Sequence, residues 1–444
     1  MTAEAAAAAC AELVARTQSE RRLPSISATV FRGGERLWYG AAGSARLDPA
    51  TPPDSGTQYR IGSITKTFTA VLVLQLRDAG LLDLDDPVSA HVPEAAHGDA
   101  TVRRLLAHLS GLQREPVGEV WESLATPSRD ELLANLAESE RVLPPHFRWH
   151  YSNLAYAVLG EVVARRAGGT WEEALADRLL RPLGLARTTL APEAPFAQGY
   201  LVRPYEDRAA EEPDFVLNGV AAAAALWSTC DDLARWGAFL LEPDPAVLKP
   251  ETLAEMTSVH TMADPDGWTL GWGLGLMLFR RGERLLAGHT GGMPGHVSVL
   301  AVSRKDGVGA AALCNNSAGF PARMMGPRLV ETWLEHDPAP VTPWAPGEGV
   351  PDAYAGVLGR WWSEGGEWVF SWRGGRVEAL PDGAPPGTAV SAFAPAGDDT
   401  LRCVAGHEEG EWLRLVRDGS GAVVKMYWAT YPLTREQSTF GSTG

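Results

Sequence analysis

Apolar and polar residues alternate near both ends of the first 335 residues, a pattern typical of β-strands. Two of the apolar runs flank Gly33-Gly34, which suits a hairpin turn because glycine accepts the positive φ angles of such turns. Strands are expected at residues 25–32, 35–40, 276–280, 285–287, 296–303 and 308–314. Because strands joined by a hairpin run antiparallel, the pattern predicts one antiparallel sheet built from both ends of this region.

The chain between these strands has apolar residues every three or four positions, the repeat of an α-helix that buries one face. Helices are expected at residues 65–79, 101–107, 130–138, 153–167, 170–180 and 231–241, with a first helix at the amino terminus and a closing one at 321–335. The expected fold is therefore α/β of the α+β kind, in which helices flank an antiparallel sheet and an all-helical region lies beside it.

The carboxy-terminal part of the chain has a different pattern. Residues 337–352 contain five prolines among Gly, Ala and Asp, a composition typical of an extended linker. Short apolar runs at hairpin spacing follow at residues 368–372, 376–379, 412–416 and 423–427. The sequence thus predicts a first domain at 1–336, a linker at 337–352 and a small β-barrel domain at 353–444.

Composition narrows the class of protein. The 444 residues are 45% apolar and 21% charged, which predicts a large folded core rather than disorder. The net charge of −16 argues against nucleic acid or an anionic membrane as partner, and no apolar run approaches the roughly 18 residues of a membrane span. The first residues lack the basic segment of a secretory signal, and the four cysteines lack metal-binding spacing. We therefore expect a cytoplasmic protein with reduced thiols.

Ser63 and Lys66 lie three residues apart at the start of a predicted helix, which places both side chains on one face. A serine hydroxyl becomes a good nucleophile when a nearby base accepts its proton, and a buried lysine can be that base because burial lowers its pKa. The chain has 23 serines and four lysines, so chance alone predicts about 0.2 such pairs. Taken alone, the pair is weak evidence for catalysis and is better explained by a helix start with a solvated lysine.

Two further motifs adjoin predicted elements. Tyr151-Ser152-Asn153 precedes a predicted helix, where it is also typical of a helix cap with a half-buried tyrosine. Residues 288–292, Gly-His-Thr-Gly-Gly, follow one predicted strand and precede another, where they would also suit a glycine-rich hairpin loop. The occurrence of all three motifs in this order is what points to a catalytic site.

In this order the motifs resemble those of the penicillin-recognising serine hydrolases, which include class C β-lactamases, D-Ala-D-Ala carboxypeptidases, D-aminopeptidases and related esterases. That family carries Ser-x-x-Lys, Tyr-x-Asn and Lys/His-Thr-Gly motifs. They are matched here by Ser63 with Lys66, Tyr151 with Asn153, and His289 with Gly291. The resemblance covers residues 20–335, and the tyrosine of the second motif points to the class C branch. The tail resembles, more loosely, a small β-barrel that some members carry.

The resemblance implies an acyl-enzyme mechanism without a metal or an organic cofactor. Ser63 would be the nucleophile and Lys66 its proton partner, while Tyr151 would carry the proton to the leaving group and later activate water. Asn153 would hold Lys66 and the substrate by hydrogen bonds. The backbone N–H groups of Ser63 and Gly292, the latter on an edge strand, would form the oxyanion hole.

His289 stands where β-lactamases usually have lysine, and a mostly neutral histidine predicts poor β-lactamase activity. The predicted function is hydrolysis of an amide or peptide bond in a small-molecule or short-peptide substrate of the D-amino-acid type. A carboxylesterase of the same family and a catalytically silent binding or scaffold protein are the alternatives. His108 is expected to be structural, and His146 with His150 lacks the HExxH pattern of a zinc site.

Overall fold

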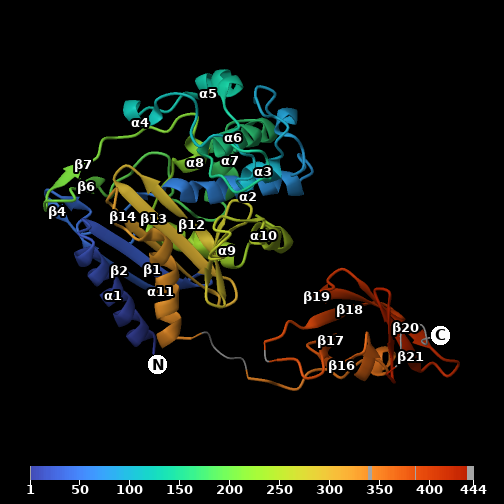
Figure 1. The fold of residues 1–444 in the computed structure, drawn as a ribbon. Helices are drawn as coiled ribbons and strands as arrows, with labels where there is room; N and C mark the ends of the chain where they lie inside the picture. The colour runs from blue at the N-terminus through green and yellow to red at the C-terminus, as the bar shows by residue number, and fades with distance from the viewer. Residues whose placement is uncertain (1, 339–342, 386, 438–444) are drawn as a thin grey trace. The chain divides into compact units, whose positions relative to one another are not determined.

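An antiparallel sheet of eight strands forms the centre of Met1–Pro340, one of two units into which the computed structural model divides the chain (Figure 1). The structure describes residues 2–338, 343–385 and 387–437. The strands are β1 (Ser25–Arg32), β2 (Glu35–Gly43), β9 (Thr261–Met262), β10 (Leu270–Trp272), β11 (Met277–Arg281), β12 (Arg284–Met293), β13 (His296–Ser303) and β14 (Val308–Cys314). Their order, β2-β1-β14-β13-β12-β11-β10-β9, confirms that both ends of the region contribute to one sheet.

Helices cover both faces of this sheet. Helices α1 (Ala3–Glu20) and α11 (Ala322–His336) pack together against one face, and α9 (Cys230–Leu241) packs against the other (Figure 1). Strand β13 shows how the sequence builds both cores, because neighbouring side chains of a strand point to opposite faces. Val299 belongs to the core under α1 and α11, whereas Leu300 belongs to the core shared with the other helices.

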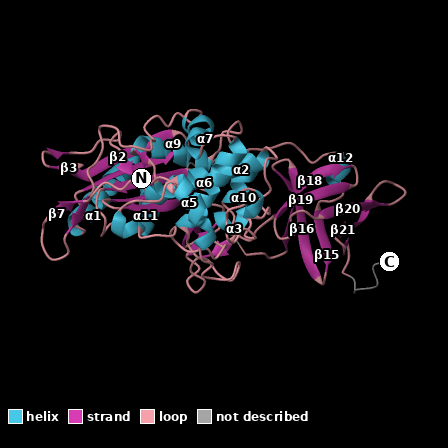
Figure 2. Cartoon of the chain, turned by 90° about the horizontal axis from the view of Figure 1, so that it is seen from above, coloured by secondary structure: helices cyan, strands magenta, loops and turns pink. Residues whose placement is uncertain are grey.

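The predicted helical region lies beside the α9 face of the sheet (Figure 2). It is built around a nearly completely buried helix, α2 (Thr65–Asp78). Its other helices are α3 (Val102–Leu106), α4 (Val120–Ser123), α5 (Arg129–Asn135), α6 (Asn153–Ala167), α7 (Trp171–Leu175), α8 (Ala221–Ala224) and α10 (Pro250–Met256). The short strands of this unit are β3 (Arg46–Leu47), β4 (Ala50–Thr51), β5 (Tyr59–Arg60), β6 (Tyr200–Val202), β7 (Ala209–Glu211) and β8 (Trp227–Ser228).

Two predicted helices end earlier as α-helices than their periodicity indicates. The helix expected at 170–180 is α7 followed by a π-helical turn, Ala176–Leu180, and the one expected at 130–138 is α5 followed by a 3-10 turn, Leu136–Glu138. Both types of turn keep one apolar face inward, so periodicity does not distinguish them from α-helix.

The unit Val341–Gly444 contains a closed barrel with its own core. After the short helix α12 (Asp352–Ala355), its strands are β15 (Gly359–Ser363), β16 (Gly366–Arg373), β17 (Arg376–Pro381), β18 (Ser391–Gly397), β19 (Thr400–Ala405), β20 (Trp412–Arg417), β21 (Val423–Trp428) and β22 (Tyr431–Thr434). Pairing of β15 with β22 closes the barrel around Trp361, Phe370 and Phe393. The fold class, including the small barrel, is as predicted, while residues 339–342 of the predicted linker lie outside the described residues.

The structure also bears on the sequence expectations about cysteines, metal-binding clusters and membrane-spanning helices. The four cysteines are buried and carry free thiols. Among the described residues, no three His, Cys, Asp or Glu side chains are grouped so that they could hold a metal ion. In the same part of the chain, every helix is too short or too polar to cross a membrane.

Candidate active site

Ser63 lies in a single 3-10 turn, Gly62–Ile64, that runs directly into α2. Two hydrogen bonds hold the residue at the start of this turn. Ile61 N donates to Leu226 O at 2.9 Å, and Ser298 Oγ on β13 donates to Ile61 O at 2.8 Å. The turn that carries the predicted nucleophile is therefore fixed to the central sheet.

Two glycines allow this turn to approach β12 closely. Gly62 has a φ of +50°, and a Cβ atom there would lie 2.7 Å from Gly292 N. A Cβ atom at Gly291 would lie 1.8 Å from Ile61 O. Neither side chain would fit without separating the turn from the strand. The backbone nitrogen of Gly292 thus lies next to the turn that holds Ser63.

Lys66, on the first turn of α2, is completely buried and directs Nζ at three oxygen atoms. These are Ser63 Oγ at 3.1 Å, Asn153 Oδ1 at 2.8 Å and Ala223 O at 2.8 Å. Burial lowers the pKa of Lys66 well below its usual value, although the charge of Glu115 opposes this effect. A neutral amine can donate to the amide and carbonyl oxygens and still offer its lone pair to the Ser63 hydroxyl. Lys66 is therefore placed to accept the serine proton.

Asn153 is the first residue of α6, and Ser152 caps the helix. Ser152 Oγ also donates to Gln113 O at 2.7 Å, which ties the cap to the preceding loop. Asn153 uses both ends of its amide, because Oδ1 accepts from Lys66 while Nδ2 donates to Glu115 Oε1 at 2.7 Å. A continuous hydrogen-bond chain therefore runs from Ser63 to Glu115.

Tyr151, next to this cap, is packed among other rings at the base of the site. Its ring stacks on His108 with 4.4 Å between centroids, and Lys66 Nζ lies 4.9 Å from its centroid. Burial raises the pKa of Tyr151 above its usual value, whereas hydrogen bonding with Ser63 and the charge of Arg114 lower it. Deprotonation of Tyr151 therefore depends on the charges around it.

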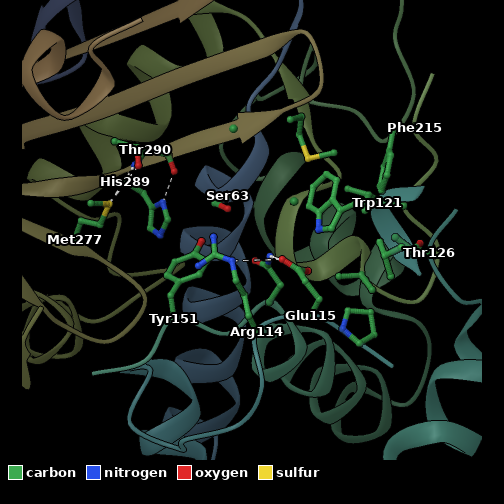
Figure 3. A pocket seen from close by; sticks show the side chains of 18 of the residues that line it. Ser63, Arg114, Glu115, Trp121, Thr126, Tyr151, Phe215, Met277, His289 and Thr290 are labelled. Carbon is green, nitrogen blue, oxygen red and sulfur yellow. Dashed lines mark hydrogen bonds and ion pairs between the residues drawn. The ribbon is translucent and has the colours of Figure 1, made fainter. Parts of the chain in front are cut away.

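His289 extends from β12 toward Tyr151 (Figure 3). If Nδ1 carries the proton, it donates to Thr290 O at 2.5 Å, which leaves Nε2 as a bare acceptor. Burial, reinforced by nearby Lys66, lowers the pKa of His289 to about 3. The imidazole is therefore neutral at pH 7, and this position of the motif carries no positive charge.

The strand that carries Gly292 is not a simple edge strand, in contrast to what the resemblance implied. Strand β12 lies between β11 and β13, because the hairpin after Arg281 places β11 beside its first half. Pairing with β11 ends at Gly288, so in the described sheet residues 289–293 pair with β13 alone. The second half of β12 therefore has one open side, and Gly292 lines the cleft there.

A cleft of about 660 Å³ opens above these groups. Five of the six predicted site residues line it, and Lys66 lies beneath Ser63. One wall of the cleft is apolar, and Trp121 stacks there on Phe215 with 5.4 Å between ring centroids (Figure 3). The five lining residues from the sequence prediction are Ser63, Tyr151, Asn153, His289 and Gly292.

Sequence reasoning missed three charged residues that line the cleft, Arg323 and the neighbours Arg114 and Glu115. The side chains of these neighbours form an ion pair with 3.6 Å between Arg114 Nε and Glu115 Oε1, and burial raises the pKa of the Glu115 carboxyl. The available signal was no more than a pair of adjacent opposite charges, more than thirty residues before the Tyr-x-Asn motif. His108 is buried beneath the site, where its Nδ1 accepts a hydrogen bond from Ser152 N at 3.1 Å.

Two protein-family models match this chain. The family described as Beta-lactamase matches residues 10–332, and a domain of unknown function, DUF7586, matches residues 350–435. Penicillin-binding protein 4 of Amycolatopsis lactamdurans is 30% identical over 67% of this chain and 82% of its own length. The chain spans from about half to four fifths of the length of the curated relatives it matches.

The solved structures that resemble the chain include the following two. A D-stereospecific amidohydrolase from Streptomyces sp. is 28% identical and has a TM-score of 0.62, covering 72% of this chain and 97% of its own. An octameric penicillin-binding protein homologue from Pyrococcus abyssi has a TM-score of 0.66 at 23% identity, covering 96% of this chain and 99% of its own. The second likeness extends the similarity of fold to nearly the whole chain.

Proposed function

Since the chain belongs to the beta-lactamase family of serine hydrolases, we propose that it hydrolyses an amide or peptide bond of a D-amino-acid compound through an acyl-enzyme on Ser63. The observation that carries this proposal is the 3.1 Å contact between Lys66 Nζ and Ser63 Oγ at the base of an open cleft. A nucleophile and its base in hydrogen-bond contact, with room for a substrate above them, are the requirements of covalent catalysis.

In the acylation step, Ser63 Oγ attacks the carbonyl carbon of the substrate while its proton passes to Tyr151, either directly or through Lys66. The carbon–nitrogen bond then breaks, and the leaving amine takes that proton from Tyr151. Negative charge on the carbonyl oxygen is stabilised by the backbone N–H groups of Ser63 and Gly292. This role is supported by the glycine contact, because it brings Gly292 N close to the turn that carries Ser63. Water then attacks the ester, giving its proton to Tyr151, and the acid leaves as Ser63 recovers its proton.

The choice of a D-amino-acid compound is supported by the Streptomyces amidohydrolase, which is named for D-stereospecificity. The apolar wall supports a further detail. Trp121 and Phe215 form a flat apolar surface beside Ser63, and Val120 and Met293 continue it. We propose that the side chain on the acyl part of the substrate packs on this wall, which favours large apolar groups.

A carboxylesterase is the second candidate, and one observation favours it. His289 is neutral, so the motif provides no fixed cation to bind the terminal carboxylate that carboxypeptidase substrates carry. Substrates without that carboxylate, such as amino-acid amides and short esters, therefore suit the cleft better than D-Ala-D-Ala peptides. Amides and esters are cleaved by the same acyl-enzyme steps, so rates rather than residues distinguish them.

The experiment that tests the proposal is intact-mass measurement after incubation with a fluorophosphonate and with a penicillin. We expect a single adduct with the fluorophosphonate that Ser63→Ala abolishes, and peptide mapping should place it on Ser63. The same variant's thermal unfolding serves as the control for folding. If neither the fluorophosphonate nor the penicillin formed an adduct, the proposal would be overturned and a silent binding protein would be supported.

A substrate panel then separates the two candidates. It contains D- and L-phenylalanine amide, D-alanine amide, a D-Ala-D-Ala peptide, a cephalosporin and p-nitrophenyl acetate. The proposal expects kcat/KM to be highest for D-phenylalanine amide. Turnover of the ester with none of any amide would instead identify a carboxylesterase.

A further inference from the structure

The third motif of this site lacks the positive charge that a lysine would supply. His289 is 1% exposed, its Nδ1 hydrogen-bonds to Thr290 O, and it is neutral. Of the four lysines in the chain, Lys66 alone adjoins the cleft, and its own amine must be neutral to act as a base. Yet a buried phenol is a poor base unless a cation stabilises its anion.

Arg114 supplies a cation at the required place. Its guanidinium carbon lies 4.9 Å from the centroid of the Tyr151 ring, and Figure 3 shows this group between Tyr151 and Glu115. Its main chain is fixed independently of its side chain, because Arg114 O accepts from Asn153 N at 2.7 Å and from Leu154 N at 3.1 Å. Arg114 is therefore attached to the same helix start that positions Tyr151.

We propose that Arg114 is a positioning residue of the reaction, whose charge stabilises deprotonated Tyr151 in place of the cation that His289 does not provide. This inference rests on the proposed function, in which Tyr151 carries a proton. Arg114 lies in a loop outside the three motifs. In the family's motifs, the lysine of the third motif, whose place His289 takes on β12, would supply this positive charge.

Other charged or titratable groups surround Tyr151, and those that carry a charge influence its pKa. Lys66 faces the ring from α2, and Glu115 carries the opposing negative charge. His108 and His289 face it at 4.4 and 6.3 Å between centroids, and burial keeps both neutral.

The charge of Arg114 lowers the pKa of Tyr151 and also that of Lys66. The direction of the pKa shift is therefore the same whichever of the two groups holds the proton. Removing the charge of Arg114 must therefore make the Lys66–Tyr151 pair bind a proton more readily. The acidic limb of the kcat/KM profile, where that proton inactivates the pair, then moves to higher pH. Because the Arg114 side chain is 61% exposed, water weakens the effect, and we expect a shift of about half a pH unit.

The test compares pH profiles of kcat/KM for p-nitrophenyl acetate, an uncharged substrate that makes no ion pair with the protein. Arg114→Gln should move the acidic limb upward by about half a unit, so that activity below the limb falls about threefold. Arg114→Lys, which keeps the charge, should restore the limb. Glu115→Gln keeps the acceptor for Asn153 but removes the negative charge, and it should move the limb downward.

Two further variants sharpen this test. Arg114→Gln combined with His289→Lys returns a cation to the third motif and should bring the limb back toward its original position. Arg323→Gln removes another arginine that lines the cleft, and it should shift the limb less than Arg114→Gln does. If the double variant does not fold, ionic strength replaces it: salt should raise the limb of the unaltered protein and have less effect on Arg114→Gln.

The inference would be overturned if the acidic limb of the kcat/KM profile did not move in Arg114→Gln. It would also be overturned if Arg114→Gln lost activity equally at all pH values and Arg114→Lys did not restore that activity. The fluorophosphonate adduct separates this failure from failure of the proposed function. If the unaltered protein forms the adduct on Ser63 while the limb stays fixed, the proposed function stands and the role of Arg114 does not.

Discussion

The floor and the apolar wall of the cleft differ in how firmly their side chains are held. The floor consists of Ser63, Lys66, Tyr151 and Asn153, whose polar groups are held by hydrogen bonds between α2 and the start of α6. The wall consists of Val120, Trp121, Phe215 and Met293, and its largest side chain, Trp121, is 49% exposed. Rigid polar groups suit a reaction that every substrate shares, whereas a half-exposed ring over buried apolar side chains can adjust to the substrate. We therefore expect substitutions in the floor to affect all substrates and those in the wall to affect some.

The largest effect expected is that of Ser63→Ala. Without the hydroxyl no acyl-enzyme forms, so kcat/KM should fall by about 10⁴ or more for every substrate in the panel. Steady-state kinetics and the missing adduct in intact-mass spectra are the measurements. Residual turnover of 10% on any one substrate would mean that the floor is not common to all of them.

Lys66→Arg should reduce kcat/KM by about a thousandfold, because a guanidinium keeps its proton and cannot serve as the base. This variant separates proton transfer from charge, since arginine is a cation as well. The remote substitution Lys249→Arg is the matched control and should leave kinetics unchanged. If Lys66→Arg were nearly as active as the unaltered protein, the amine would act by its charge instead.

Gly62→Ala should lower kcat about a hundredfold, because the added methyl group pushes the Ser63 turn away from Gly292 and weakens the oxyanion hole. Gly80→Ala is the control: Gly80 also has a positive φ, but a Cβ atom there has nothing within 4 Å. Both variants therefore bear backbone strain, and the clash is confined to Gly62. Equal losses of activity in the two variants would refute the role of this contact.

His289, which faces the floor from β12, should also make the fold sensitive to acid. Its pKa is about 3 in the folded protein but near 6.5 in an unfolded chain, so below pH 6.5 the unfolded state binds a proton that the folded state does not. Stability is therefore lost as pH falls from 6.5 toward 3. Between pH 7.5 and 5 this amounts to about 2 kcal/mol for one histidine.

Urea unfolding at pH 7.5 and 5 measures this effect. His289→Gln should lose less stability over that interval than the unaltered protein, by about 2 kcal/mol. His407, which is exposed, provides the control, and His407→Gln should lose as much as the unaltered protein. An identical loss in His289→Gln would show that this histidine is not held neutral.

The smallest effect expected concerns the wall. Trp121→Ala should lower kcat/KM for D-phenylalanine amide about tenfold and change the value for D-alanine amide by less than twofold, because a small side chain does not reach the indole. Trp268→Ala removes an exposed tryptophan outside the cleft and should change neither. Equal losses of kcat/KM on both amides would show that Trp121 contributes to the reaction of every substrate, as the floor residues do.

Much of the fold was predictable from periodicity because the central strands of the sheet, such as β13 and β14, are buried and mostly apolar. Strands β13 and β14 have the same bounds as the runs from which they were predicted. The second half of β12 was not recognised, because glycines and polar residues replace the apolar pattern where the strand lines the cleft. In the barrel, β15, β18, β19 and β22 were not predicted. In β18, Pro395 and Gly397 interrupt the apolar pattern and lie at an irregularity in its pairing with β19.

The site was predictable where a residue belongs to a short motif with fixed spacing. Ser63 with Lys66, and Tyr151 with Asn153, adjoin helix starts, so local sequence also determines their geometry. Arg114 and Glu115 lie in a loop without periodicity, and their position depends on hydrogen bonds to α6 across more than thirty residues of chain. Single-sequence patterns contain no information about such contacts.

The glycine contact between the Ser63 turn and β12 limits how this protein can be redesigned. No atom can be added at Gly62 or Gly291 without separating nucleophile from strand, so these two positions offer no freedom for changing substrates. Libraries aimed at new substrates should therefore diversify the segments around Trp121 and Phe215, which lie on the other side of Ser63 from His289 (Figure 3).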